Sequence, residues 1–180
     1  MDFQESQTYI NLQVALKELL ETNTLLEIFE AAAAEEVLIP INFLFNTTAR
    51  NVRYIAIYLY SILYGETSTL ENLQVASIRE NEGRLVYLDY SDTAIEEGFD
   101  DIASLFNGIS NIMLNHSIAY DNAILDIENG TLYCQPGESL WICLGCGNIL
   151  SGICAPDICP VCGVSGRYYR RYTATNNVFF

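Results

Sequence analysis

The chain has 180 residues, of which 51% are apolar, so it can bury one sizeable core plus a small module and is not a disordered protein. Its 23 acidic and 8 basic residues give a formal net charge of −15, which repels nucleic-acid phosphates and anionic lipid. The sequence has no apolar run of membrane-spanning length and no signal-peptide pattern at its first residues. We therefore expect a cytoplasmic protein with no nucleic-acid or membrane partner.

An internal repeat covers most of the N-terminal part of the chain. The sequence Asn-Leu-Gln-Val-Ala at residues 11–15 recurs at residues 72–76, an offset of 61 (72 minus 11). The same offset relates the glutamate pair at 35–36 to that at 96–97. It also relates three apolar positions of the first unit, Ile41, Leu44 and Phe45, to Ile102, Leu105 and Phe106. The repeat indicates a duplicated structural unit.

Each unit is predicted to be a helical hairpin. Apolar residues of the first unit recur at helical spacing on both sides of a break near residues 37–40, and Pro40 suits the first turn of the second helix. The second unit has its turn at residues 96–99, where Gly98 ends a helix. Two hairpins that each need to cover an apolar stripe predict an all-α four-helix bundle over residues 1–128, which the family resemblance given below identifies as ferritin-like.

Beyond the repeat, helical periodicity fades. Asn129-Gly130 and Pro136-Gly137 are turn signals, and we expect residues 129–139 to be a linker. Residues 140–180 have no helical stripe and are predicted to form a small module of strands and loops that depends on a metal for stability.

Two Cys-x-x-Cys-Gly motifs in this module have the spacing of a tetrahedral four-thiolate metal site. The glycine after each pair, Gly147 or Gly163, can adopt the positive φ that a tight turn over a metal requires. Two disulfides or unpaired buried thiols are the alternatives. Cys134 and Cys154 have no such partner and are placed outside the metal shell. The predicted ligands are Cys143, Cys146, Cys159 and Cys162.

The whole chain resembles the rubrerythrin family, in which a duplicated helical hairpin precedes a rubredoxin-like module. The resemblance is carried by residues 130–133, by Trp141, by both cysteine pairs and by Ala155-Pro156. It implies an iron bound by four cysteines, a di-iron site in the bundle, reduction of hydrogen peroxide in oxidative-stress defence, a redox partner protein and a homodimer.

The bundle departs from the family at most of its metal-ligand positions. Only Glu80 and His116 remain, and His116 is the only histidine in the chain. We therefore expect no di-iron site, and interpret Glu80 and His116 as a buried pair that hydrogen-bond each other or a nearby Tyr; a residual metal site and surface exposure are the alternatives. The family ligands are replaced at Leu19, Val52, Ile55, Gly83 and Met113.

Three functions are consistent with these residues. The favoured one is electron transfer through one rubredoxin-type iron centre, because Trp141, the Cys159-Pro dipeptide and the spacing of the pairs favour iron over zinc. The second is a rubrerythrin-type peroxidase, an oxidoreductase whose site here lacks most ligands. The third is a structural zinc ribbon on a bundle that binds other proteins.

Overall fold

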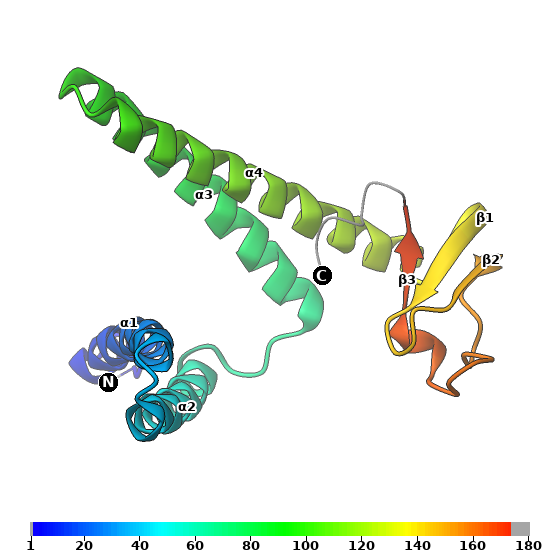
Figure 1. The fold of residues 1–180 in the computed structure, drawn as a ribbon, viewed down its shortest axis with the longest axis horizontal. Coiled ribbons are helices and arrows are strands. Elements are labelled where there is room, and N and C mark those ends of the chain that lie inside the picture. Colours follow the sequence, from blue (N-terminus) through cyan, green and yellow to red (C-terminus); the bar gives the residue numbers. More distant parts are fainter. Residues whose placement is uncertain (1, 174–180) are drawn as a thin grey trace. The chain divides into compact units, whose positions relative to one another are not determined.

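Four long helices and a three-stranded sheet follow one another along the chain (Figure 1). The computed structural model describes residues 2–173. The helices are α1 (Gln7–Glu35), α2 (Ile39–Tyr64), α3 (Thr69–Glu96) and α4 (Asp100–Glu128), and the strands are β1 (Cys134–Cys143), β2 (Ile149–Cys154) and β3 (Tyr169–Tyr172). A short 3₁₀ helix, η1 (Gly166–Tyr168), precedes β3. These elements confirm the predicted fold class of repeated helical hairpins followed by a β/loop module.

The chain divides into two compact units between Thr67 and Ser68. The first unit holds the hairpin α1–α2, and the second holds the hairpin α3–α4 and the sheet. Within each hairpin the two helices run antiparallel and pack along their length (Figure 1). Within residues 2–173, none of the helices combines the length with the sustained apolar character that crossing a bilayer requires.

The two hairpin turns occupy equivalent positions of the repeat. In the second hairpin Gly98 has φ 83°, and the N–H of Phe99 donates to the carbonyl of Ala94 at 2.8 Å. In the first hairpin the N–H of Leu38 makes the equivalent bond at 2.9 Å, but Val37 occupies the left-handed position with φ 58°. The predicted breaks are therefore confirmed, and one of them places a β-branched residue where glycine is favoured.

Helix starts follow the expected signals. Pro40 lies in the first turn of α2, where a missing N–H costs nothing. Ser68 caps α3 in a reciprocal arrangement: its hydroxyl accepts from the N–H of Glu71 at 3.2 Å, and the Glu71 carboxylate accepts from the N–H of Ser68 at 2.7 Å. The bond from the Ser68 backbone lowers the pKa of Glu71.

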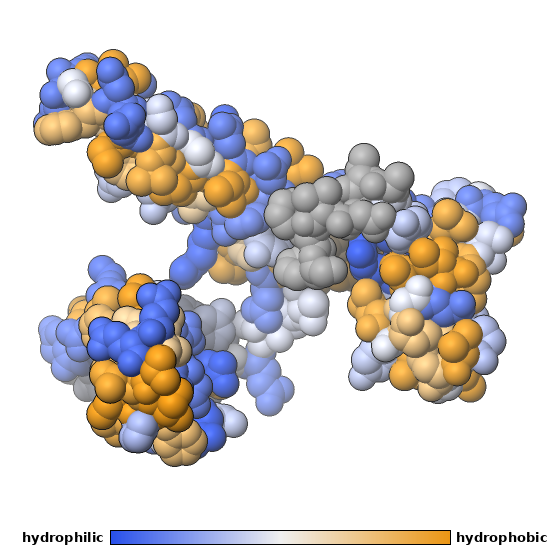
Figure 2. Space-filling view, in the orientation of Figure 1, coloured by the Kyte–Doolittle hydropathy of each residue, from blue (hydrophilic) through white to orange (hydrophobic). Residues whose placement is uncertain are grey.

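Small side chains line the helix contact inside each hairpin. Ala33, Ala49 and Ala56 are buried in α1–α2, and Ser91, Ala103, Ser110 and Ser117 are buried in α3–α4. Large aliphatic side chains such as Ile55 and Ile112 remain about half exposed, at 51% and 53%. Figure 2 shows such apolar residues at the surface of both hairpins. Each hairpin thus carries apolar surface that its own two helices leave uncovered.

The sheet has the strand order β2-β1-β3 with both pairs antiparallel. Strand β1 begins at Cys134, so the linker predicted over residues 129–139 is in part a strand. The turn signal Pro136-Gly137 lies in an irregularity of the β1–β2 ladder, between the pairs Cys134–Cys154 and Ser139–Gly152. A bulge tolerates a residue without an N–H, which explains why a turn signal occurs inside a strand.

Candidate metal centre

Two loops of the C-terminal module have the same local structure. In the first, the N–H of Cys143 donates to the carbonyl of Asn148 at 2.9 Å and the N–H of Gly147 donates to the carbonyl of Cys143 at 2.8 Å. In the second, Cys159 and Gly163 make the equivalent bonds at 2.8 and 2.9 Å. Gly147 and Gly163 have φ values of 76° and 75°, as their places after the cysteine pairs predict.

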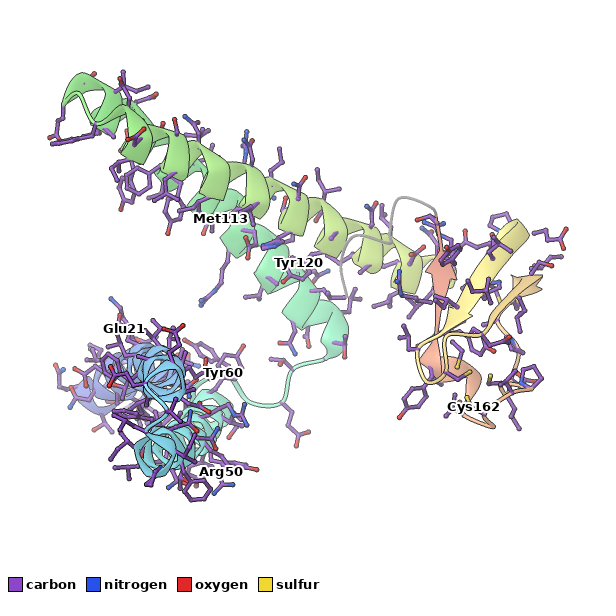
Figure 3. All side chains as sticks on the ribbon, viewed as in Figure 1. Glu21, Arg50, Tyr60, Met113, Tyr120 and Cys162 are labelled. Carbon is purple, nitrogen blue, oxygen red and sulfur yellow. A yellow bond between two sulfur atoms is a disulfide. The ribbon has the colours of Figure 1, made fainter. Side chains whose placement is uncertain are left out.

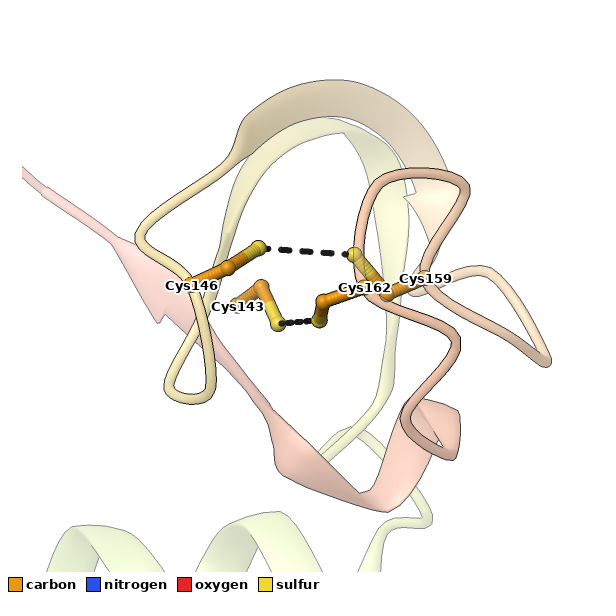
Figure 4. Close-up of side chains that lie close together, drawn as sticks. All are labelled: Cys143, Cys146, Cys159 and Cys162. Atoms are coloured by element: carbon orange, nitrogen blue, oxygen red, sulfur yellow. Dashed lines mark hydrogen bonds between the residues drawn. The ribbon is translucent and has the colours of Figure 1, made fainter.

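The two loops bring the four predicted ligands together (Figure 4). All four Sγ atoms lie within 4.8 Å of one another. Cys143 Sγ lies 3.7 Å from Cys162 Sγ, and Cys146 Sγ lies 3.7 Å from Cys159 Sγ. A tetrahedron with metal–sulfur bonds of about 2.3 Å has edges of about 3.8 Å. The thiols therefore fit one tetrahedral metal ion, and the disulfide alternative for these four residues is wrong.

The centre is half enclosed. Cys143 and Cys159 are 1% exposed and form a core cluster with Trp141 and Tyr169, whereas Cys146 and Cys162 face solvent. The Trp141 indole N–H donates to the carbonyl of Gly152 at 3.0 Å, which fixes the ring against β2. The inner side of the centre is therefore packed and rigid, and its outer side, at Cys146 and Cys162, is open to solvent.

The thiols differ in acidity. The Tyr169 hydroxyl is the largest influence on Cys159 and lowers the pKa of that thiol to about 6, assisted by the backbone N–H groups of Cys162 and Val161. The same interaction raises the pKa of Tyr169 to about 12. Within residues 2–173 the buried Tyr169 oxygen has no hydrogen-bond partner, so its hydroxyl is free to donate to a Cys159 thiolate.

Cys146 shifts in the opposite direction. The backbone N–H of Asn148 lowers its pKa, but crowding by the Cys162, Cys159 and Cys143 thiols together with burial outweighs this effect and raises the pKa to about 12. Cys159 thus loses its proton readily, whereas Cys146 resists adding a second negative charge beside it. A divalent cation relieves that repulsion and displaces the remaining protons.

The two other cysteines lie outside the cluster, as predicted, but they form a disulfide with each other. Cys134 and Cys154 are directly opposed in the β1–β2 ladder. A linker over residues 129–139 would give Cys134 no strand partner, so the sequence does not predict this bond. Had the strand been recognised from Cys134 to Cys143, pairing it with the strand after the first cysteine loop would have placed the two thiols opposite each other.

Glu80 on α3 and His116 on α4 contact each other, with Nδ1 3.4 Å from Oε2. The expected burial is wrong for this hairpin taken by itself: the imidazole is 53% exposed and the carboxylate is 24% exposed. Within the described residues no third carboxylate or imidazole joins them in a cluster that could hold a metal ion. The pair alone offers too few ligands for two ions.

Two of the bundle positions at which the resemblance predicts replaced ligands make packing contacts. The Met113 side chain on α4 lies over Gly83 on α3: a Cβ added at Gly83 would be 2.5 Å from Met113 Cε (Figure 3). In the first hairpin, Leu19 packs against the core cluster around Leu16. A glutamate at position 83 would have to displace the Met113 thioether.

Comparison with known proteins agrees with this architecture. A family profile described as "Rubrerythrin, rubredoxin-like domain" matches residues 141–170. Rubrerythrin of Porphyromonas gingivalis is 34% identical over 103 residues, which are 57% of this chain and 52% of that protein. The chain thus spans about half the length of that relative and of rubrerythrin-1 of Clostridium acetobutylicum, at 52% of each.

Longer matches exist. Rubrerythrin of Clostridium perfringens is 30% identical over 165 residues, covering 82% of this chain and 85% of that protein. Among solved structures, the partially reduced and the fully reduced states of nigerythrin are each 21% identical, with TM-scores of 0.35 and 0.36. Both cover 93% of this chain and 87% of the solved chain. On the similarity to the C. perfringens protein, the chain belongs to the rubrerythrin family.

Proposed function

We propose that this protein transfers electrons through a single rubredoxin-type iron centre held by Cys143, Cys146, Cys159 and Cys162. The observation that carries the proposal is the pair of 3.7 Å sulfur–sulfur distances, which fit one tetrahedral ion bound by four thiolates. Four thiolates also suit zinc. Membership of a family with a rubredoxin-like domain favours iron.

When bound, iron in a four-thiolate site supplies one-electron chemistry by cycling between two oxidation states. The protein's part is to hold the four sulfurs and to set their electrostatic environment. Backbone N–H groups of Asn148, Val161 and Cys162 point their positive ends at the thiolates, and Trp141 with Tyr169 excludes water from the inner side. The exposed edge at Cys146 and Cys162 is where a redox partner protein would approach.

We further propose that the helical part no longer holds two irons. Five ligand positions of the family carry apolar residues or glycine, and the Met113 thioether occupies the space over Gly83. The remaining pair, Glu80 and His116, offers one carboxylate and one imidazole. Without those ligands the hairpins stabilise the fold and mediate association between chains. Hydrogen peroxide reduction is the alternative function, and it would require iron bound in the bundle.

The exposed aliphatic residues of both hairpins support a homodimer in which the helices of two chains cover one another. Sedimentation equilibrium on the metal-loaded protein tests this point, and a monomer at micromolar concentration would contradict it. We also propose a cytoplasmic location.

A reductive titration tests the proposed electron transfer. Protein purified without oxygen is oxidised, and its visible thiolate-to-iron absorbance is followed during stepwise addition of a one-electron reductant. We expect reversible bleaching with one electron per bound iron and no peroxide turnover above that of free iron. A colourless protein with zinc would favour the structural ribbon, and peroxide turnover that requires bundle iron would favour the peroxidase.

A further inference from the structure

The Cys134–Cys154 disulfide has no part in the proposed electron transfer, yet it is accessible. It lies at the opposite end of β1 from the metal ligand Cys143. Cys154 is exposed and Cys134 is half-buried. Accessibility to an attacking thiolate is a main determinant of whether a disulfide can be exchanged. Cys154 is therefore the member of the pair that an attacking thiolate would reach first.

A pocket of about 380 Å³ adjoins the disulfide and is lined by both cysteines. Arg167 contributes a positive charge to it, Asp157 contributes a negative charge, and Ser165 contributes a hydroxyl group. The Tyr133 ring holds the guanidinium from one side, with Arg167 Cζ 5.4 Å from the ring centroid. The pocket thus combines a reducible bond, a guanidinium held by an aromatic ring, a carboxylate and room for a small zwitterionic molecule.

We propose that Cys134 and Cys154 form a redox-active pair that exchanges with a low-molecular-weight thiol carrying a carboxylate. The thiolate of that molecule attacks Cys154 Sγ, forms a mixed disulfide and expels the Cys134 thiolate. A second molecule attacks the mixed disulfide, leaves as the oxidised small-molecule disulfide and frees the Cys154 thiolate, and both protein thiolates then take up protons. The two electrons come from the two small thiols, and oxidised small-molecule disulfide reverses the sequence.

The local structure allows the bond to open without loss of the fold. The ladder beyond it is interrupted until Ser139, so residues 135–138 are not paired with β2 in a regular register. The N–H of Ala155 still donates to the carbonyl of Tyr133 at 2.8 Å, and the main ladder from Ser139 to Ile142 remains. A disulfide in a reducing compartment is usually transient, catalytic or redox-sensing, which agrees with the location proposed above.

Glutathione, a small thiol with two carboxylates, is the probe. The metal-loaded full-length protein is equilibrated with buffers of defined glutathione to glutathione-disulfide ratio, alkylated without denaturant and mapped by mass spectrometry. We expect two alkylated residues, Cys134 and Cys154, whose fraction follows the buffer ratio while the four metal ligands stay protected. A disulfide that opens only in denaturant would be a structural crosslink, and this result would overturn the proposal. Failure of glutathione disulfide to oxidise the two reduced thiols would overturn it as well.

Two variants test the pocket. Cys134→Ser leaves the exposed Cys154 alone, and we expect glutathione disulfide to give a stable mixed disulfide on Cys154; its absence would contradict binding in the pocket. Arg167→Gln should slow formation of the mixed disulfide by roughly fivefold at low ionic strength, because it removes the cation beside the bond. Arg170→Gln, the same change outside the pocket, is the matched control; an equal slowing in both variants would refute the role of Arg167.

Discussion

Gly166 connects the metal loops to the last strand, and adding one methyl group there should weaken the metal centre. A Cβ at this position would collide with the carbonyl oxygen of Pro156 and would lie 3.3 Å from the Cα of Asp157. Both neighbours are backbone atoms, which cannot rotate away. The Gly166 N–H also donates to the Asp157 carbonyl at 2.7 Å, beside the Ile158–Ser165 bridge that closes the base of the second cysteine loop.

The magnitude follows from these contacts. A carbon–oxygen contact needs about 3.3 Å, so the two segments must separate by about 1 Å. Overpacking of this kind costs about 2 kcal/mol, and the broken hydrogen bond costs about 1 kcal/mol more. The lower chain entropy of alanine in the unfolded state returns about 0.5–1 kcal/mol. The net loss of about 2 kcal/mol corresponds to a roughly 30-fold weaker metal affinity, because folding and metal binding are coupled in so small a module.

Competition with a chelator measures that affinity, and fluorescence of Trp141, the only tryptophan, reports melting of the module. Gly137→Ala is the matched control, since a Cβ at Gly137 has no atom within 4 Å. We expect Gly137→Ala to leave the affinity within about twofold of the parent. Equal effects of the two variants, or no effect of Gly166→Ala, would refute the packing argument.

Four further predictions follow from the site and the hairpins. Cys162→Ser should abolish metal binding and unfold the C-terminal module. The variant should then contain no bound metal, and its Trp fluorescence should show no melting transition on heating; retained stoichiometric metal would contradict the ligand assignment. Glu80→Gln and His116→Ala should each leave metal per chain unchanged, and loss of more than half of the bound iron in either would rule out a metal-free bundle. Metal affinity should fall as pH falls, because protons compete with the metal for the thiolates. The fall should be steeper below a pH of about 6, where Cys159 also takes up a proton that the metal must displace; an affinity that does not change with pH would contradict this. Val37→Gly should raise the free energy of unfolding by about 0.5–1 kcal/mol. The left-handed backbone costs valine about 1–2 kcal/mol, and the greater chain entropy of glycine in the unfolded state cancels part of this gain. A lower midpoint of thermal unfolding in the variant would contradict this.

The local elements of this protein could be predicted from sequence because each depends on neighbouring residues. Both hairpins could be predicted from the helical spacing of apolar residues, the glutamate–glycine turn at residues 96–99 and the position of Pro40. The Cys-x-x-Cys-Gly motif determines the loop around each metal-ligand pair, since two cysteines and a positive-φ glycine are all it needs. The four sulfurs accordingly lie together as expected.

Features that depend on partners distant in sequence could not be predicted in the same way. The Cys134–Cys154 bond requires knowing that a strand runs through Pro136-Gly137, which ordinarily signals a turn. The exposure of His116 depends on what covers the face of α3–α4, and helical periodicity identifies an apolar face without naming its occupant. The left-handed backbone of Val37 could not be predicted from its residue type either, because a β-branched side chain disfavours positive φ.

Metal content per chain, measured together with the visible spectrum on protein purified without oxygen, tests the central claim most directly. The account predicts one iron per chain with thiolate-to-iron charge-transfer bands, held by the four cysteines of the C-terminal module. Three irons per chain would contradict it, because the two additional ions would have to occupy the helical part despite the packing around Gly83 and Met113.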